Sequence, residues 1–167
     1  MLLEAIKTLG ESYALTNTVA VSPNDFSDAS KDRCVVVGVR PVSQGNSSYS
    51  TEYLYSIVSN PKVPSGKIGF AGHQRKWSQL AIGQHVEVQV KQIHNLATLL
   101  TVELEFMKTS DAQKYQDSSF NSDNMATEFS QQFNSQVFSN NQSFIFEFES
   151  VKFAAMVKSI QSVNTGK

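Results

Sequence analysis

Residues 34–39 read CVVVGV, an apolar run that stops at Arg40 and Pro41. Its apolar side chains do not alternate with polar ones, and this pattern is typical of a strand that is covered on both faces, as in a barrel or a sandwich. Similar short runs, each bounded by turn residues, read TVAV at 18–21, EYLYSIV at 52–58 and KIGFA at 67–71. The first half of the chain is therefore predicted to be mainly β.

The pattern changes after Gly83. HVEVQV at residues 85–90 and TVELEF at residues 101–106 alternate apolar and polar side chains. Alternation is typical of strands in an antiparallel sheet with one exposed face, so these two strands are predicted to lie in one such sheet. The polar stretch at residues 108–121 is predicted to be a loop.

A single helix is predicted after that loop. Met125, Phe129 and Phe133 recur every four residues, and Ser122 or Asp123 can accept backbone hydrogen bonds at its start. Phe144, Phe146 and Phe148 then alternate as in a strand, and residues 152–163 can return as its hairpin partner. We expect the phenylalanines of both segments to form a core rather than a ligand platform.

These patterns predict two packed units, a β-rich one at residues 1–84 and an α+β one at residues 85–167, with no linker between them. The first ten residues, MLLEAIKTLG, leave two readings open. Their apolar side chains fit one face of a helix, but so short a helix is marginal, and a strand fits equally well.

The overall charge excludes one group of functions. Fifteen acids against fourteen Lys and Arg give a net charge of -1, so the chain has no general positive field for nucleic acids or membrane surfaces. The start of the chain is too short and too charged for a membrane span or a signal peptide. The one cysteine, Cys34, lies in the apolar run, where we expect a buried, unreactive thiol in a reducing, cytoplasmic environment.

No pattern of catalytic or metal-binding residues is found. The sequence has no G-x-x-x-x-G-K-[ST] phosphate loop, and His73, His85 and His94 lack the spacing of metal ligands. Asp25, Asp28 and Asp32 lack the spacing of a calcium loop and are predicted to cap helices or turns. We therefore expect no catalytic residue, metal or cofactor in this chain.

One basic segment is unusual. Between Glu52 and Glu87 the chain carries Lys62, Lys67, Arg75 and Lys76 and no acid. Such a run is most often a solvated surface. Arg75 and Lys76 nevertheless stand beside Trp77, expected to pack and anchor a turn, close to the predicted boundary between the units, where clefts form. This position favours a binding surface.

Four stretches carry a resemblance to a known family: YALTNTVAVSPNDF (13–26), VPSGKIGF (63–70), QRKWSQLAIGQHVEV (74–88) and SDNMATEFSQQFNSQVFS (122–139). They resemble the N-terminal domain of N-ethylmaleimide-sensitive factor, the ATPase of vesicle fusion. The resemblance implies a double-psi β-barrel at residues 1–84, followed by an α/β roll at residues 85–167. It also implies that the first residues form a strand.

The resemblance further implies a non-catalytic domain that binds soluble attachment protein (SNAP) on SNARE complexes. The full-length protein would be a cytoplasmic homohexameric ATPase using ATP and Mg, recruited to membranes through SNAP and SNARE, whereas this fragment would be a monomer without a cofactor. The matching adaptor-binding positions are Lys7, Arg75 and Lys108, with Lys76 adjoining them and Lys114 as a substitute for Lys108. Two alternatives remain: a regulatory domain contacting its own ATPase domains, and the adaptor domain of a ubiquitin-linked AAA unfoldase.

Overall fold

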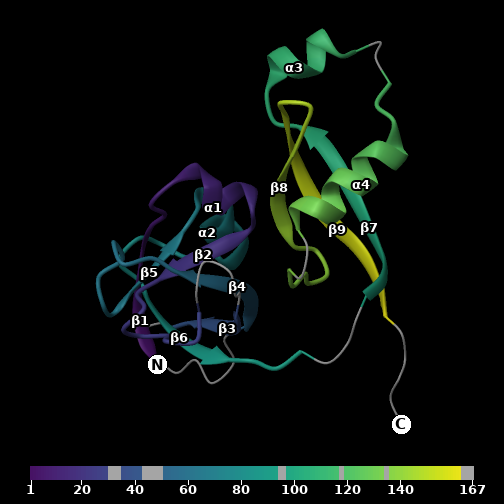
Figure 1. Cartoon of the computed structure of the whole chain (residues 1–167). Coiled ribbons are helices and arrows are strands. Elements are labelled where there is room, and N and C mark those ends of the chain that lie inside the picture. The colour runs from purple at the N-terminus through teal and green to yellow at the C-terminus, as the bar shows by residue number, and fades with distance from the viewer. Residues whose placement is uncertain (30–34, 43–50, 94–96, 117–118, 134–135, 163–167) are drawn as a thin grey trace.

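The computed structural model describes residues 1–29, 35–42, 51–93, 97–116, 119–133 and 136–162. These residues form a β-barrel lobe and a second lobe built on a three-stranded sheet (Figure 1). The strands of the barrel are β1 (Leu2–Lys7), β2 (Thr18–Val21), β3 (Val35–Pro41), β4 (Tyr53–Ser59), β5 (Lys67–Phe70) and β6 (His85–Val90). The helices of this lobe are α1 (Glu11–Leu15) and α2 (Gly72–Ser78). The second lobe contains β7 (Ala97–Phe106), α3 (Thr109–Lys114), α4 (Ser122–Gln132), β8 (Ser143–Phe148) and β9 (Val151–Ser162).

The barrel is closed, with strand order β1-β5-β2-β4-β3-β6. The β1–β5 and β2–β4 pairs are parallel and the remaining pairs are antiparallel. A closed mixed barrel followed by an α/β lobe is consistent with the predicted double-psi barrel and roll, so the predicted fold class is confirmed. The first residues form strand β1, as the resemblance implied.

Burial explains why the barrel strands lack alternation. All four residues of β2 are buried, as are the consecutive residues Val37, Gly38 and Val39 of β3. The side chains inside the barrel form its core, and the opposite faces of these strands are covered as well. At Gly38 the cover is the side chain of Glu52, whose Cδ would lie 2.5 Å from a Cβ atom at that position. The prediction from residues 34–39 is confirmed for the part that the structure describes.

Strand β6 corrects one prediction. Residues 85–90 pair antiparallel with β1 and β3 inside the barrel, and not with residues 101–106. The turn before β6 brings this about: Gly83, at φ +90°, donates to the Ala5 carbonyl at 2.7 Å, and Ala5 donates back to the Gln84 carbonyl at 2.8 Å. The barrel strands thus continue six residues past the expected division at residues 84 and 85, to Val90, which is 58% exposed.

The second lobe is an antiparallel sheet in the order β7-β9-β8, with α4 on one face (Figure 1). The predicted β8–β9 hairpin and the helix are confirmed, and the phenylalanines form the core of this lobe. The helix cap differs from the prediction. The side-chain oxygen of Asn121, rather than Ser122 or Asp123, accepts from the backbone N–H groups of Asp123 and Asn124 at 2.9 and 3.1 Å.

The structure contains short helices that the sequence patterns did not predict. Helix α3 occupies part of the stretch predicted as a loop, and α2 carries the Arg-Lys pair, where a turn was expected. Each is six or seven residues long, too short to show a repeated apolar stripe. In the described part of the chain, no helix is long and apolar enough to cross a membrane.

Among the acidic residues predicted to cap turns, Asp25 does so. Its carboxylate accepts from the Ser65 hydroxyl and the Gly66 N–H, both at 2.8 Å. Asp32 lies outside the described residues, as do Cys34 and His94.

A candidate cationic docking face

Helix α2 is held against the barrel by one buried amide. The Gln74 Nε2 donates to the Thr18 carbonyl at 3.2 Å, and its Oε1 accepts from the Ala71 N–H at 2.8 Å. The Tyr55 hydroxyl donates to the Gln74 carbonyl at 3.0 Å. Burial raises the pKa of Tyr55 well above its usual value, so this hydroxyl stays protonated and remains a donor. These bonds fix the orientation of α2.

Trp77 packs on the same side of the helix. Its ring meets Tyr53 and Tyr55 edge to face, with centroid distances of 4.9 and 5.5 Å. Such aromatic pairs contribute stabilising free energy in addition to that from burying their surface. The predicted packing role of Trp77 is confirmed, although it fixes a helix and not a turn.

The Arg-Lys pair lies on the outer side of α2. Gln74 and Ser78 face the barrel, whereas Lys76, between them in sequence, is exposed. Arg75 is half-buried, and its Nη1 donates to the Phe70 carbonyl at 3.2 Å. This bond directs the guanidinium group toward the end of β5.

Lys7 reaches the same end of the barrel from β1. It is paired with Phe70 in the β1–β5 register, and the next residue, Thr8, donates its N–H to the Phe70 carbonyl at 3.0 Å. One carbonyl oxygen therefore accepts from Arg75 and from the residue that follows Lys7. Lys7 is exposed, and the shared carbonyl places the end of β1 next to Arg75, although Lys7 and Arg75 are 68 positions apart in the sequence.

Lys108 belongs to the second lobe, at the end of β7 and the start of α3, and it is exposed. Its neighbour Met107 donates its N–H to the Lys152 carbonyl at 3.3 Å. Lys152 forms an ion pair with Glu11 of α1, which joins the two lobes. Sequence patterns gave no signal for Lys152, because its position depends on the pairing of distant strands.

Glu11 is an acid among these cations. The hydrogen bond and charge of Lys152 hold the pKa of Glu11 below its usual value, and the charge of Lys108 adds a smaller effect in the same direction. Lys108 is thus close enough to influence Glu11 electrostatically. The surface around Lys108 is therefore not uniformly positive, since Glu11 offsets part of the charge of Lys108 and Lys152.

Within the described ranges, Lys7, Arg75, Lys76 and Lys108 form no ion pair with a carboxylate. We refer to these four residues as the cationic face. Lys67 and Lys114 differ from these four residues. Lys67 pairs with Glu4, and Lys114 lies over the Tyr115 ring at 5.2 Å from its centroid. Lys114 is thus engaged in a contact within its own lobe.

The cationic face adjoins the contact between the lobes. Helices α1 and α2 lie at the end of the barrel that meets β8 (Figure 1). His73 of α2 is half-buried, and burial lowers its pKa to about 4. This histidine is neutral at pH 7 and adds no charge to the face.

The sequence was compared with known proteins. No family model matches it. It is 25% identical over 161 residues to the vesicular-fusion protein SEC18 of Saccharomyces cerevisiae, covering 93% of this chain and 19% of that protein. It is 28% identical over 173 residues to the vesicle-fusing ATPase of Caenorhabditis elegans, covering 96% of this chain and 19% of that protein. The predicted resemblance to the vesicle-fusion ATPases is confirmed.

A further relative agrees with these two. The vesicular-fusion protein sec18 of Schizosaccharomyces pombe is 26% identical over 168 residues, covering 95% of this chain and 18% of that protein. The similarity thus extends over both lobes. The chain spans about a fifth of the length of each of these curated relatives.

Proposed function

We propose that this chain is a non-catalytic docking domain of a vesicle-fusion ATPase, and that its cationic face binds an acidic surface of soluble attachment protein (SNAP) on SNARE complexes. The observation that carries the proposal is that Arg75 and the backbone of Thr8, which follows Lys7, donate to one carbonyl, that of Phe70, so that Lys7 and Arg75 come to the same end of the barrel as the exposed Lys76. None of these groups is neutralised by a carboxylate among the described residues. Long-range attraction to an acidic partner follows from such an arrangement.

In this proposal, ATP is hydrolysed by another part of the full-length protein. The relatives that are named for ATPase activity or vesicle fusion are about five times longer than the matched region. In this proposal the remaining chain binds ATP and Mg and assembles into a homohexamer, and the present domain delivers the SNARE complex to it.

Binding by one copy is expected to be weak. Exposed ion pairs contribute about 0–1 kcal/mol each, and charges at the rim of an interface act mainly on the rate of encounter. Several copies in one hexamer, each facing a SNAP molecule, raise the overall affinity ~100-fold or more through effective concentration. A modest single-domain affinity is therefore compatible with the proposed role.

Charge reversal tests this proposal. SNAP binding is measured by titration at several salt concentrations, with the wild-type chain and with the Arg75→Glu/Lys76→Glu variant. We expect the variant to bind at least about tenfold more weakly at low salt, with a smaller difference at high salt, because screening weakens the lost attraction. Equal affinities without salt dependence would contradict the electrostatic mechanism.

A matched pair of single variants provides the control. Lys76 and Lys62 are both exposed and neither forms an ion pair within the described residues. Lys62 precedes the start of β5, however, whereas the cationic face lies at the end of that strand. Lys76→Glu should weaken SNAP binding and Lys62→Glu should not. Equal losses in both would mean that only net charge matters.

A further inference from the structure

Strand β7 is an edge of the second sheet. In the order β7-β9-β8, and as far as the structure describes the chain, β7 pairs with β9 only. It is ten residues long. Every second residue of an edge strand directs its N–H and C=O groups away from the sheet, which makes such an edge a template for another strand.

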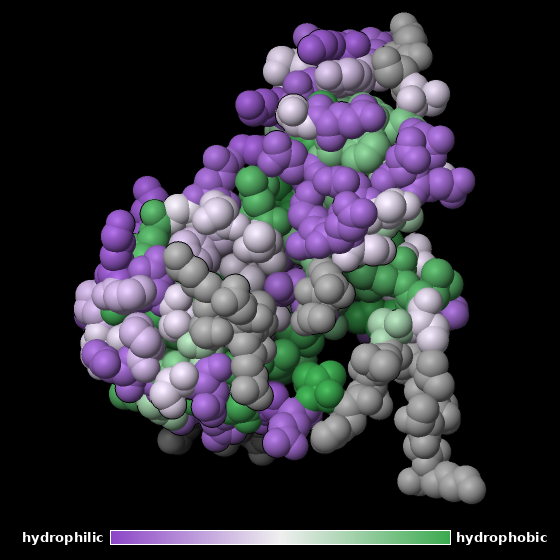
Figure 2. Space-filling view, viewed as in Figure 1, coloured by the Kyte–Doolittle hydropathy of each residue, from purple (hydrophilic) through white to green (hydrophobic). Residues whose placement is uncertain are grey.

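An apolar groove runs beside this edge, between β7 and α4. Its volume is about 590 Å³, and its walls include Leu99, Leu100 and Val102 from the strand and Met125, Ala126 and Phe129 from the helix. Leu99 is 53% exposed. Figure 2 shows apolar surface near the start of β7, beside α4. The groove is therefore open to a ligand and lies along unpaired backbone.

This combination fits an extended peptide. A strand added to β7 would direct every second side chain into the groove and the others over the opposite face of the sheet. Backbone hydrogen bonds would come from the free edge, and apolar contacts from the groove. A peptide with alternating side chains matches both requirements.

The charges near β7 indicate which peptide side chains suit the face of the sheet opposite the groove. Glu103 and Glu105 are exposed on the face of β7 that points away from the groove, and only Glu103 has an ion-pair partner in the described part, Lys158 at 3.2 Å. The exposed acids Asp123 and Glu128 lie on α4. Incoming residues opposite Glu103 and Glu105 are stabilised when they are basic.

A second copy of this chain is a poorer occupant. β7 reads ATLLTVELEF and contains no Lys or Arg, so a second β7 would bring two more acids and no complementary charge. We propose that the groove between β7 and α4 binds an extended peptide of another protein by strand addition, and that this peptide alternates large apolar residues with Lys or Arg. The groove shares no residue with the cationic face, so this site is independent of SNAP docking.

Three synthetic peptides test the proposal by fluorescence polarisation. The first alternates Leu or Val with Lys over nine residues. The second has the same composition with the apolar residues grouped together, and the third has Glu in place of Lys. We expect the first to bind at least about tenfold more tightly than the others. Equal affinity of the first two, or no binding of any peptide at 1 mM, would overturn the proposal.

Strand addition is tested by removing peptide N–H groups. The alternating peptide is N-methylated on its odd-numbered or its even-numbered amides. Because only one set can face β7, one methylated peptide should lose binding and the other should retain it. Retention or loss of binding by both methylated peptides would exclude pairing with the strand edge.

Variants locate the site in the protein. Ala126→Trp fills the groove from an exposed position of α4, and Thr127→Trp adds the same side chain one residue away, where it does not line the groove. The first should weaken binding of the alternating peptide at least about tenfold and the second should leave it unchanged. Arg75→Glu/Lys76→Glu should also leave it unchanged. Equal effects of the two tryptophans, or competition of peptide binding with self-association of the chain, would overturn the proposal.

Discussion

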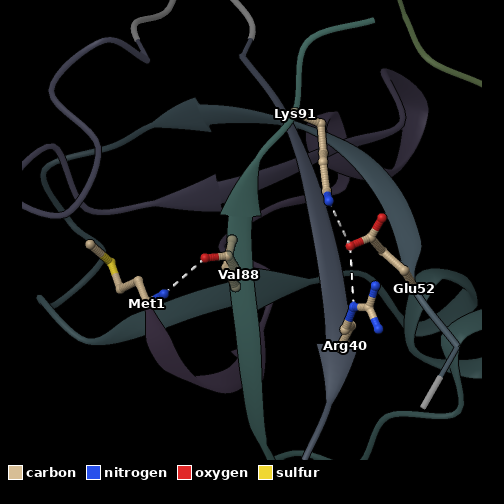
Figure 3. A network of polar contacts seen from close by, with 5 residues as sticks. All are labelled: Met1, Arg40, Glu52, Val88 and Lys91. Atoms are coloured by element: carbon tan, nitrogen blue, oxygen red, sulfur yellow. Dashed lines mark hydrogen bonds and ion pairs between the residues drawn. The ribbon is translucent and has the colours of Figure 1, made fainter. Parts of the chain in front are cut away.

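Gly38 and Glu52 form one unit in the barrel wall. The Glu52 Oε2 lies 3.3 Å from the Arg40 Nε and 3.2 Å from the Lys91 Nζ (Figure 3). These ion pairs hold the Glu52 side chain over Gly38. Gly38→Ala would displace that side chain. We expect a loss of about 1–2 kcal/mol in the free energy of unfolding, measured with denaturant.

The double variant provides the control for this explanation. Once Glu52→Ala has removed the obstacle, Gly38→Ala should become neutral or stabilising by about 0.5 kcal/mol, because alanine loses less backbone entropy in a strand than glycine. If Gly38→Ala were equally destabilising in both backgrounds, its effect would not arise from Glu52.

His73 predicts a pH dependence of stability. Its pKa is lowered by burial from 6.5 to about 4 in the folded chain, so the unfolded chain binds more protons between these values. Above pH 6.5 His73 is neutral in both states and does not lower the free energy of unfolding. As the pH falls from 6.5 toward 4, protonation of His73 in the unfolded chain lowers that free energy. We expect His73→Asn to reduce the loss of unfolding free energy between pH 7 and 4.5 by about 1–2 kcal/mol. An unchanged pH profile would show that His73 contributes nothing.

At the scale of elements, α2 depends on Gln74. Gln74→Ala would leave the Ala71 N–H and the Thr18 carbonyl without their side-chain partner. We expect a loss of about 2–3 kcal/mol in unfolding free energy and faster hydrogen exchange in α2. Gln113→Ala, at an exposed position of α3, is the matched control and should change neither quantity.

The elements that the sequence predicted are those with a local signal. The apolar run at residues 35–39 and the repeat of Met125, Phe129 and Phe133 indicated a covered strand and a helix, and both are present. Helix α2 begins with Gly72 and owes its place to hydrogen bonds with Thr18 and Tyr55, which lie far away in sequence. No local pattern records such contacts.

At the scale of the whole molecule, the Glu11–Lys152 ion pair links the two lobes. We expect Glu11→Lys and Lys152→Glu each to weaken this link, because each places like charges together, and the double exchange to restore it. Inter-lobe NMR contacts between α1 and β8 measure the effect. Their persistence in both single variants would show that apolar packing alone joins the lobes.

The pairing of β6 and the positions of the lysines of the cationic face are also set by contacts between residues far apart in the sequence. The alternation at residues 85–90 indicated an antiparallel strand correctly, but pairing with β1 follows from the Gly83 turn. The sequence singled out Arg75 and Lys76 by charge, and the resemblance added Lys7 and Lys108. Only the three-dimensional structure shows that Arg75 and the N–H of Thr8, the residue after Lys7, share the Phe70 carbonyl and that Glu11 lies near Lys108.

Hydrogen exchange of the chain with and without SNAP tests the central claim most directly. If the cationic face is the docking surface, SNAP should slow exchange in α2, at the end of β1 and around Lys108, and should leave β7 and α4 at the apolar groove unchanged. Arg75→Glu/Lys76→Glu should abolish this protection. Protection confined to the groove, or to the barrel end that carries Lys62, would contradict the account.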